Sequence, residues 1–198
     1  MDKKLAMALY KAGCIKFGEF TLKSGMKSPF YVDLRNIVSF PKTMDFIGKT
    51  LSKKARGLKF DRIAGVPYAG IPIAVVFSLH AKKPMVYTRK ERKDHGMKKM
   101  VEGIFSVGEK VLVVDDIITT GESKIEAIQP LLESGLKVKD VLVVVDREHG
   151  GKEFLEEKGF ILHSAIKITE MVGFLEQKGF VAKKHARESL EFVKSGGK

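Results

Sequence analysis

Residues 111–123 read VLVVDDIITTGES, and this stretch is the strongest indication of the fold in the sequence. A run of β-branched apolar residues ends in two acids, and a Thr-Thr-Gly turn then opens a helical segment. Short apolar runs bounded by turn residues are typical of buried strands. Ligands of open parallel sheets bind beyond the carboxyl ends of the strands, which is where this turn must lie. The stretch therefore predicts a buried strand and, at its end, a ligand site.

The turn at 119–123 has the groups that bind a phosphate. Gly121 permits close approach of the backbone, and the N–H groups at a helix N-terminus favour an anion. Hydroxyl side chains in the turn add further donors. The sequence has no GxxxxGK[ST] pattern, which disfavours a nucleoside triphosphate as the ligand.

The two acids that end the apolar run are Asp115 and Asp116, and we expect them at the strand tip beside the phosphate turn. Carboxylates next to a phosphate suit a ligand with sugar hydroxyls or a divalent cation. A ribose 5-phosphate suits both the phosphate turn and the acid pair. The alternative is that the acid pair only caps the following helix.

The alternation of apolar runs and helical spacing extends outward from this stretch in both directions. Because strands alternate with helices, we predict an α/β fold with a parallel sheet that is covered on both faces and has right-handed crossovers. The predicted core strands are 63–66, 85–87, 111–114 and 141–145, with helices at 71–80 and 123–133. The flanking predictions are helices at 2–13, 41–55, 150–157, 169–178 and 182–194, short strands or ordered loops at 18–38, and a strand at 160–168.

The segment 89–108 interrupts this alternation. Its first eleven positions hold six basic and two acidic residues, a local net charge of +4. It is too charged for a core helix and too long for a tight turn, so we predict a mobile lid over the edge of the sheet. The alternative is a plain solvated surface, which is the usual role of a charged loop.

Length and composition limit the possible classes of protein. The chain has 198 residues, 44% of them hydrophobic, which predicts one globular domain and excludes a disordered chain. The net charge of +12 predicts an anionic partner, whether nucleic acid, a membrane surface or a phosphorylated small molecule. We expect a cytoplasmic protein, since the sequence shows no secretory signal or membrane-spanning apolar run. The single Cys14 excludes an internal disulfide and a CxxC metal site.

Four strings of the sequence resemble known proteins. Residues 111–123 resemble the signature of the type I phosphoribosyltransferases: hydrophobic residues, two acids, two threonines and a glycine. FTLKSGMKSP at 20–29, RKERKDHG at 89–96 and DRE at 146–148 resemble the orotate phosphoribosyltransferase family, in that family's order. The resemblance runs from the N-terminal segment to about Glu148. It implies the type I phosphoribosyltransferase fold, a central parallel sheet flanked by helices.

The resemblance also implies the organisation of the chain and its activity. The chain is expected to form a single phosphoribosyltransferase domain over 1–198, in which 1–40 contribute to a small N-terminal hood and 89–108 form a flexible lid. The implied enzyme is a glycosyltransferase of de novo pyrimidine (UMP) biosynthesis. It transfers ribose 5-phosphate from 5-phosphoribosyl 1-diphosphate (PRPP) to N1 of orotate, giving orotidine 5′-phosphate and diphosphate.

The same resemblance implies the cofactor and the partners. The cofactor is Mg²⁺, which is held mainly by the substrate diphosphate, so no protein ligand is assigned to it. The other implied features are a homodimer whose lid is shared across the interface, and the absence of nucleic-acid and membrane partners.

The expected site residues follow from the resemblance. Breaking the bond between C1 and the diphosphate builds positive charge on the sugar and negative charge on the leaving group. The implied catalytic residues are Asp115 and Asp116 near the ribose, and Lys93 and His95 on the lid. Arg147 is expected to pair with the orotate carboxylate through its planar fork of donors. The full set of expected substrate-binding residues is Lys23, Phe30, Tyr31, Tyr68, Arg89, Lys90, Lys93, His95, Asp115, Asp116, Thr119, Thr120, Gly121, Glu122, Ser123 and Arg147.

One loop departs from the family's pattern. VPYAGIP at 66–72 is implied to present backbone N–H groups to the diphosphate. Bacterial members of the family have a lysine after the tyrosine, whereas this chain has Ala69. The missing cation increases the share of charge stabilisation that we assign to the lid.

Two alternatives keep the fold and change the function. A regulator that binds PRPP and nucleic acid would suit the basic charge, but no helix-turn-helix segment is evident ahead of the core. A purine phosphoribosyltransferase would keep the chemistry and change the base. Lys23 with Arg147 suits an acidic pyrimidine better than a purine.

Overall fold

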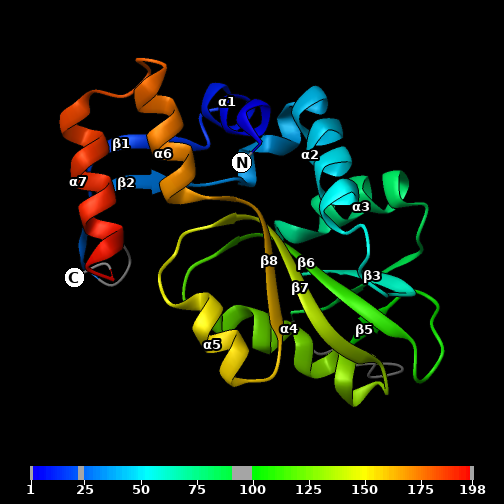
Figure 1. Ribbon diagram of the computed structural model, residues 1–198. Helices are drawn as coiled ribbons and strands as arrows, with labels where there is room; N and C mark the ends of the chain where they lie inside the picture. The colour runs from blue at the N-terminus through cyan, green and yellow to red at the C-terminus, as the bar shows by residue number, and fades with distance from the viewer. Residues whose placement is uncertain (1, 22–24, 91–99, 197–198) are drawn as a thin grey trace.

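A computed structural model describes residues 2–21, 25–90 and 100–196. Its centre is a six-stranded sheet of order β5-β4-β3-β6-β7-β8 (Figure 1). All neighbouring strands are parallel except β4 and β5, which are antiparallel. The strands are β3 (Arg62–Gly65), β4 (Met85–Thr88), β5 (Val101–Glu102), β6 (Lys110–Ile118), β7 (Lys137–Asp146) and β8 (Ile161–Lys167). The predicted α/β fold with a central parallel sheet is confirmed.

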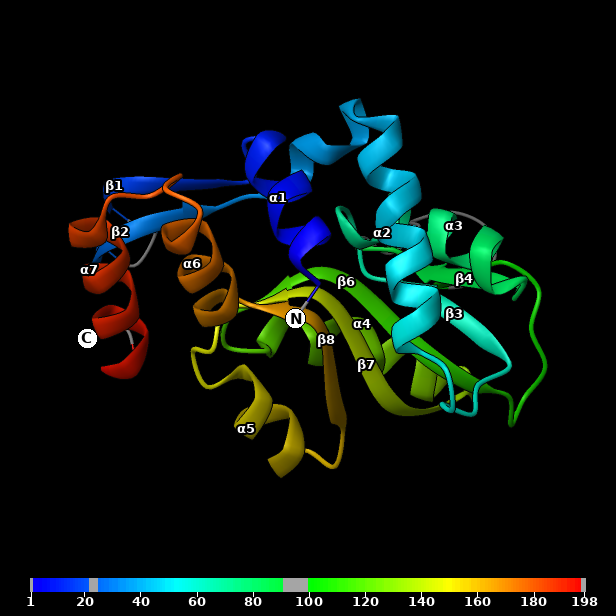
Figure 2. The same ribbon diagram turned by 45° about the horizontal axis from the view of Figure 1, so that its top comes forward.

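Helices cover both faces of this sheet (Figures 1 and 2). On one face, α2 (Pro41–Lys54) and α3 (Gly70–Ala81) pack in one hydrophobic cluster with Leu112 and Val114. On the other face, α4 (Glu122–Glu133) and α5 (Gly151–Glu157) pack in a second cluster with Val113. The division follows from the strand geometry, because successive side chains of a strand point to opposite faces.

A second, smaller unit lies beyond the carboxyl ends of β7 and β8, and we call it the hood. It joins α1 (Lys3–Lys11) and the antiparallel pair β1 (Ile15–Thr21) and β2 (Lys27–Val32) to α6 (Ile168–Gln177) and α7 (Lys183–Lys194) (Figure 1). The two ends of the chain meet in it, since Phe30 of β2 packs edge-on against Phe192 of α7 with ring centroids 5.9 Å apart. A short 3₁₀ helix, η1 (Arg35–Ser39), connects β2 to α2.

Two sequence predictions differ from the structure in detail. We expected the strand at 111–114 to end before the acids, but β6 continues to Ile118, and Asp115 pairs in register with Val143 of β7. The acids therefore lie inside the strand and not at its tip, because Ile117 and Ile118 continue the apolar sequence and find a partner in the long β7. The expected lid at 89–108 contains β5, and its two described ends lie side by side, since Arg89 N–H donates to the Met100 carbonyl at 2.8 Å.

Within the three described ranges, no helix is both long and apolar enough to span a membrane.

Candidate active site

A cleft of about 780 Å³ opens at the carboxyl ends of β3 and β6. Four segments line it: the end of β2 with the residues up to Val38, the loop 66–69 with Pro72 of α3, the end of β6, and the turn that begins α4. This is the edge of the sheet where the sequence predicts a ligand site. The cleft therefore joins the predicted acid pair and the predicted phosphate turn in one space.

The acid pair lies deep in this cleft. Asp115 is 5% exposed and Asp116 is 8% exposed. A side chain at Gly70 would put its Cβ 2.8 Å from the Asp115 Oδ1 atom, so only glycine lets α3 approach the carboxylate this closely. Asp115 Oδ1 also accepts the N–H of Asp116 at 2.8 Å. The position of the pair is thus fixed by backbone contacts from β6 and close packing of α3.

Lys124 is a site residue that the sequence analysis missed. It is 4% exposed, and its Nζ lies 2.5 Å from Asp115 Oδ2 and 3.2 Å from Ser123 Oγ. A lysine is seldom this buried unless its charge is paired. Its place in the first turn after a double-acid strand is the only sequence signal that could have pointed to this contact. The ion pair neutralises one of the two buried carboxylates.

The two acids differ electrostatically as a result. The pKa of Asp116 is raised to about 7, first by burial and next by the negative charge of Asp115, while the positive charge of Lys124 opposes the shift. Burial disfavours the charged form of a carboxylic acid, and a like charge nearby adds to this. Asp116 therefore changes its protonation state near neutral pH.

The phosphate turn has the conformation that its sequence predicts. Gly121 has φ of 95°, in the left-handed region, and a Cβ there would lie 2.9 Å from the Phe154 ring. The helix α4 begins directly afterwards, so the N–H groups of Glu122 and Ser123 have no acceptor within the helix, whereas the Lys124 N–H donates to the Gly121 carbonyl at 2.9 Å. The predicted turn residues that line the cleft are Thr119, Thr120, Gly121 and Ser123, whereas Glu122 is exposed and is not among the lining residues.

The aromatic residues predicted to contact a base are separated by the pleat of β2. Tyr31 lines the cleft, and Arg35, which we did not predict, donates to its hydroxyl at 3.4 Å. Phe30 points to the opposite side and is fully buried in the core. Its ring forms the floor under Arg147, whose guanidinium carbon lies 5.5 Å from the ring centroid.

Arg147 follows the last residue of β7 and packs over Phe30 of the hood, and it is not among the residues that line the cleft. Its Nε and Nη2 atoms are buried and have no hydrogen-bond partner among the described residues. Burial lowers the pKa of Arg147 from its ordinary value, although an arginine stays charged at neutral pH. A buried guanidinium with unused donors is a site for an anion, and a carboxylate matches its fork geometry.

The remaining predicted residues lie at the mouth of the cleft or outside the described ranges. Tyr68 lines the cleft, and the Lys90 Nζ lies 5.7 Å from the centroid of its ring. Arg89 donates to Glu102 Oε1 of β5 at 2.9 Å, so its charge is paired on the sheet edge. The predicted Lys23, Lys93 and His95 lie outside the residues that the structure describes.

Comparisons with known proteins agree with this geometry. Residues 35–174 match the family model described as the phosphoribosyl transferase domain. An orotate phosphoribosyltransferase of Pyrococcus abyssi is 39% identical over 173 residues, which cover 86% of this chain and 95% of that relative. The solved orotate phosphoribosyltransferase of Aeropyrum pernix superposes with a TM-score of 0.77 at 34% identity, covering 90% of this chain and 99% of that one.

A longer protein also matches. The UMP synthase of Leishmania donovani superposes with a TM-score of 0.90 at 36% identity, over 98% of this chain. This chain spans 42% of the length of that synthase.

Proposed function

Since the chain belongs to the orotate phosphoribosyltransferase family of phosphoribosyl transferase domains, we propose that its cleft transfers the ribose 5-phosphate of PRPP to N1 of orotate. The products are orotidine 5′-phosphate and diphosphate, and the reaction belongs to pyrimidine biosynthesis. The observation that carries the proposal is the single cleft in which a buried acid pair adjoins a phosphate turn.

The ribose phosphate is assigned to the β6–α4 side of the cleft. The N–H groups and hydroxyls of the turn at 119–123 hold the 5′-phosphate, and the helix N-terminus favours its charge. The Asp115 and Asp116 carboxylates accept from ribose hydroxyls and stabilise the positive charge that develops on the ring. As the C1–oxygen bond breaks and the C1–N1 bond forms, the electron pair of the broken bond leaves with the diphosphate, and the N1 proton of orotate is lost.

The base is assigned to the hood side of the cleft. The unused Nε and Nη2 donors of Arg147 suit the orotate carboxylate, because the guanidinium offers two parallel hydrogen bonds. Tyr31 offers a flat ring that lines the same cleft. A purine has no carboxylate to satisfy these buried donors, so this side of the cleft favours orotate over a purine base.

The leaving diphosphate is assigned to the loop 66–72 and the lid. With Ala69 in this loop, the cations are expected from the lid, where Lys93 and His95 are proposed to act and Lys90 adjoins Tyr68. The lid is also proposed to exclude water, which would otherwise hydrolyse the sugar cation.

We propose Mg²⁺ as the cofactor, held mainly by the substrate diphosphate. Within the described parts of the chain, no three His, Cys, Asp or Glu side chains are grouped closely enough to hold a metal ion. Mg²⁺ usually binds through substrate phosphates and few protein groups, and this cleft offers few, since Asp115 is already paired with Lys124. When bound, the ion neutralises charge on the diphosphate, and we assign no protein ligand to it.

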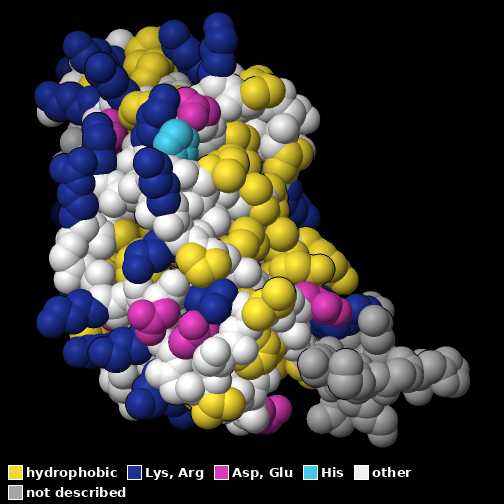
Figure 3. All heavy atoms as spheres, turned by 90° about the vertical axis from the view of Figure 1, so that its right-hand side faces the viewer, with side chains coloured by type: hydrophobic (Ala, Val, Ile, Leu, Met, Phe, Trp, Pro, Cys, Tyr) yellow, Lys and Arg dark blue, Asp and Glu magenta, His cyan; other side chains and the backbone are white. Residues whose placement is uncertain are grey.

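We also propose that the protein is a homodimer. Figure 3 shows apolar side chains gathered in a band on the face that carries α3 and the β4–β5 edge. Exposed apolar side chains in or next to these elements include Ile104 at 86% and Leu79 at 71%, with Val75 at 41% one helical turn from Leu79. A contiguous apolar band on a soluble domain is typical of an interface. Sedimentation equilibrium should give twice the chain mass, and Leu79→Glu should shift it toward one chain mass; a wild-type monomer at micromolar concentration would contradict the dimer.

A steady-state assay tests the proposed activity. Loss of orotate absorbance with Mg²⁺ and PRPP is the expected result, together with no turnover of adenine, guanine or hypoxanthine. Turnover of a purine base without orotate turnover would reject the substrate. Tight binding of duplex DNA in the absence of any turnover would favour the regulator instead.

A further inference from the structure

The residue after Arg147 has an unusual backbone conformation. Glu148 has φ of 56°, in the left-handed region that non-glycine residues rarely adopt. Such a conformation persists only where the surrounding contacts hold it. Glu148 directly follows the arginine that we assign to the orotate carboxylate, so whatever holds it also affects that arginine.

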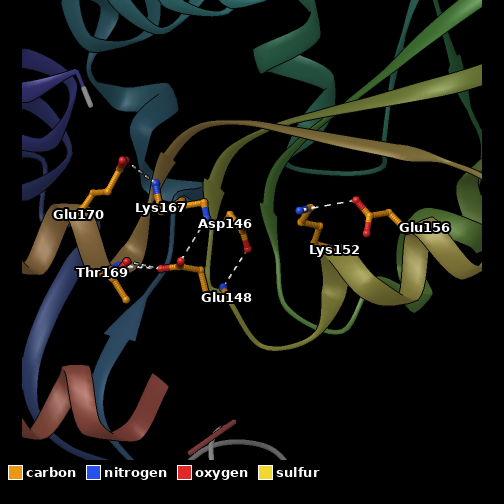
Figure 4. Close-up of polar contacts among 7 residues, drawn as sticks. All are labelled: Asp146, Glu148, Lys152, Glu156, Lys167, Thr169 and Glu170. Carbon is orange, nitrogen blue, oxygen red and sulfur yellow. Dashed lines mark hydrogen bonds and ion pairs between the residues drawn. The ribbon is translucent and has the colours of Figure 1, made fainter. Parts of the chain in front are cut away.

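Three hydrogen bonds and an ion pair hold Glu148 (Figure 4). Its N–H donates to Asp146 Oδ1 at 2.8 Å. Its Oε2 accepts from the Thr169 hydroxyl at 2.5 Å and from the Thr169 N–H at 3.0 Å. Its Oε1 lies 3.5 Å from the Lys167 Nζ. Because Thr169 lies in the first turn of α6, the carboxylate also gains from the helix N-terminus.

These contacts tie the end of β7 to the first helix of the hood. Arg147 is held on both sides, since its own N–H donates to the Ile118 carbonyl at the end of β6 at 3.1 Å. With the backbone fixed before and after it, the side chain lies over the Phe30 ring with two buried donors unused.

We propose that Glu148 is a positioning residue for substrate binding: by joining Thr169 of α6 it fixes the backbone that directs Arg147 at the orotate carboxylate. This inference rests on the proposed function of Arg147. It adds a specific role for a carboxylate that touches no reacting atom. It also predicts that Glu148 and Thr169 affect the binding of orotate more than that of PRPP, because within the described residues their hydrogen bonds and ion pair run to Asp146, Lys167 and each other, and none to the phosphate turn or the acid pair.

Two variants weaken the contact with little change in shape. Thr169→Val removes the hydroxyl donor, and Glu148→Gln removes the charge while keeping the side-chain length. Because the lost hydrogen bond is to a charged group that holds the backbone next to Arg147, the KM for orotate should rise about tenfold. The KM for PRPP should change less than about twofold, because distant sites that share no partner act nearly independently. Glu156→Gln is the matched control and should change neither KM. It removes the charge from an exposed ion pair, in which Glu156 Oε1 lies 3.6 Å from Lys152 Nζ (Figure 4).

A double variant separates positioning from general stability. If Glu148 acts through Arg147, the double variant should have almost the same KM for orotate as Arg147→Ala alone. If the two residues act independently, the fold-changes in KM should multiply. Equal rises in both KM values together with a lower Tm would show a purely structural role and overturn the proposal. So would an unchanged orotate KM in both single variants.

Different results would reject the assignment of Arg147 to orotate and the positioning role of Glu148. If Arg147→Ala leaves the orotate KM unchanged, the assignment of the base to the hood is wrong. If Arg147→Ala raises that KM and the Glu148 and Thr169 variants do not, the proposed function stands and only the positioning role is lost.

Discussion

The two sides of the cleft are built in different ways. The ribose-phosphate side comes from one continuous stretch, 115–124, in which β6, a glycine turn and the first turn of α4 follow one another. The base side combines β2, the end of β7 and the start of α6, with Phe192 of α7 packed behind Phe30. The first side is a local motif that contains a buried ion pair. The second side brings distant segments together around Arg147, whose Nε and Nη2 donors have no partner among the described residues.

Because the two sides differ in construction, they should respond differently to mutation. Changes on the ribose-phosphate side disturb buried charges and should alter both stability and turnover. Changes on the base side should alter the affinity for one substrate. The predictions below test that separation, beginning with the largest expected effect.

The largest effect is expected at Lys124. Lys124→Met should lower the free energy of unfolding by about 3–5 kcal/mol, because it leaves the Asp115 carboxylate buried without its partner. Urea unfolding monitored by circular dichroism measures this. Lys124→Met combined with Asp115→Asn should recover most of the loss, and a double variant no more stable than Lys124→Met would contradict the ion-pair explanation.

The next effect is on turnover at the acid pair. Asp116→Asn should lower kcat/KM by about 100- to 1000-fold, which is the usual cost of removing one group that stabilises transition-state charge. The steady-state orotate assay measures it. Asp45→Asn, an exposed acid on α2, is the control and should leave kcat/KM unchanged. A loss of less than about threefold in Asp116→Asn would remove this carboxylate from the mechanism.

The same variant should be more stable than the wild type above neutral pH. The folded-state pKa of Asp116 is raised from 3.8 to about 7, so the folded chain holds this proton more tightly than the unfolded chain. The resulting stabilisation is complete below about pH 4 and is lost as the pH rises to about 7. Asp116→Asn should remove that slope and gain at most about 4 kcal/mol relative to wild type at pH 8. Urea unfolding at pH 5 and pH 8 tests the sign, and equal differences at both pH values would contradict the raised pKa.

The smallest of these effects is expected on the base side. Arg147→Ala should raise the KM for orotate about 10- to 100-fold, corresponding to the loss of a charged pair of hydrogen bonds. The KM for PRPP and the free energy of unfolding should change less, because the Nε and Nη2 donors already lack hydrogen-bond partners among the described residues. A larger change in the PRPP KM than in the orotate KM would erase the distinction between the two sides.

The same contrast explains what the sequence could predict. The strands, helices and phosphate turn follow from local apolar periodicity, and so their positions agree with the structure to within a few residues at most ends. The full set of elements in the hood could not be predicted from the sequence. The Phe30–Phe192 contact joins residues at opposite ends of the chain, and no local pattern encodes it. Its β1–β2 half was anticipated, while the part played by α6 and α7 was not.

Within the site, the limits were also physical. Arg147 and the acid pair were predicted, but the position of the acids at a strand tip was wrong, because pairing with β7 extends β6 past them. Lys124 was missed, since a lysine in a helical segment is normally exposed and only the fold shows it buried. The roles of all the predicted site residues stay predictions, and Lys23, Lys93 and His95 lie outside the described ranges.

The most direct test of the two-sided cleft is a crystal structure of the protein with orotidine 5′-phosphate, which spans both sides. We predict the phosphate on the turn at 119–123, the ribose hydroxyls within hydrogen-bonding distance of Asp115 and Asp116, and the base carboxylate on the Nε and Nη2 atoms of Arg147. A phosphate bound away from that turn, or a base carboxylate pointing away from Arg147, would contradict the account.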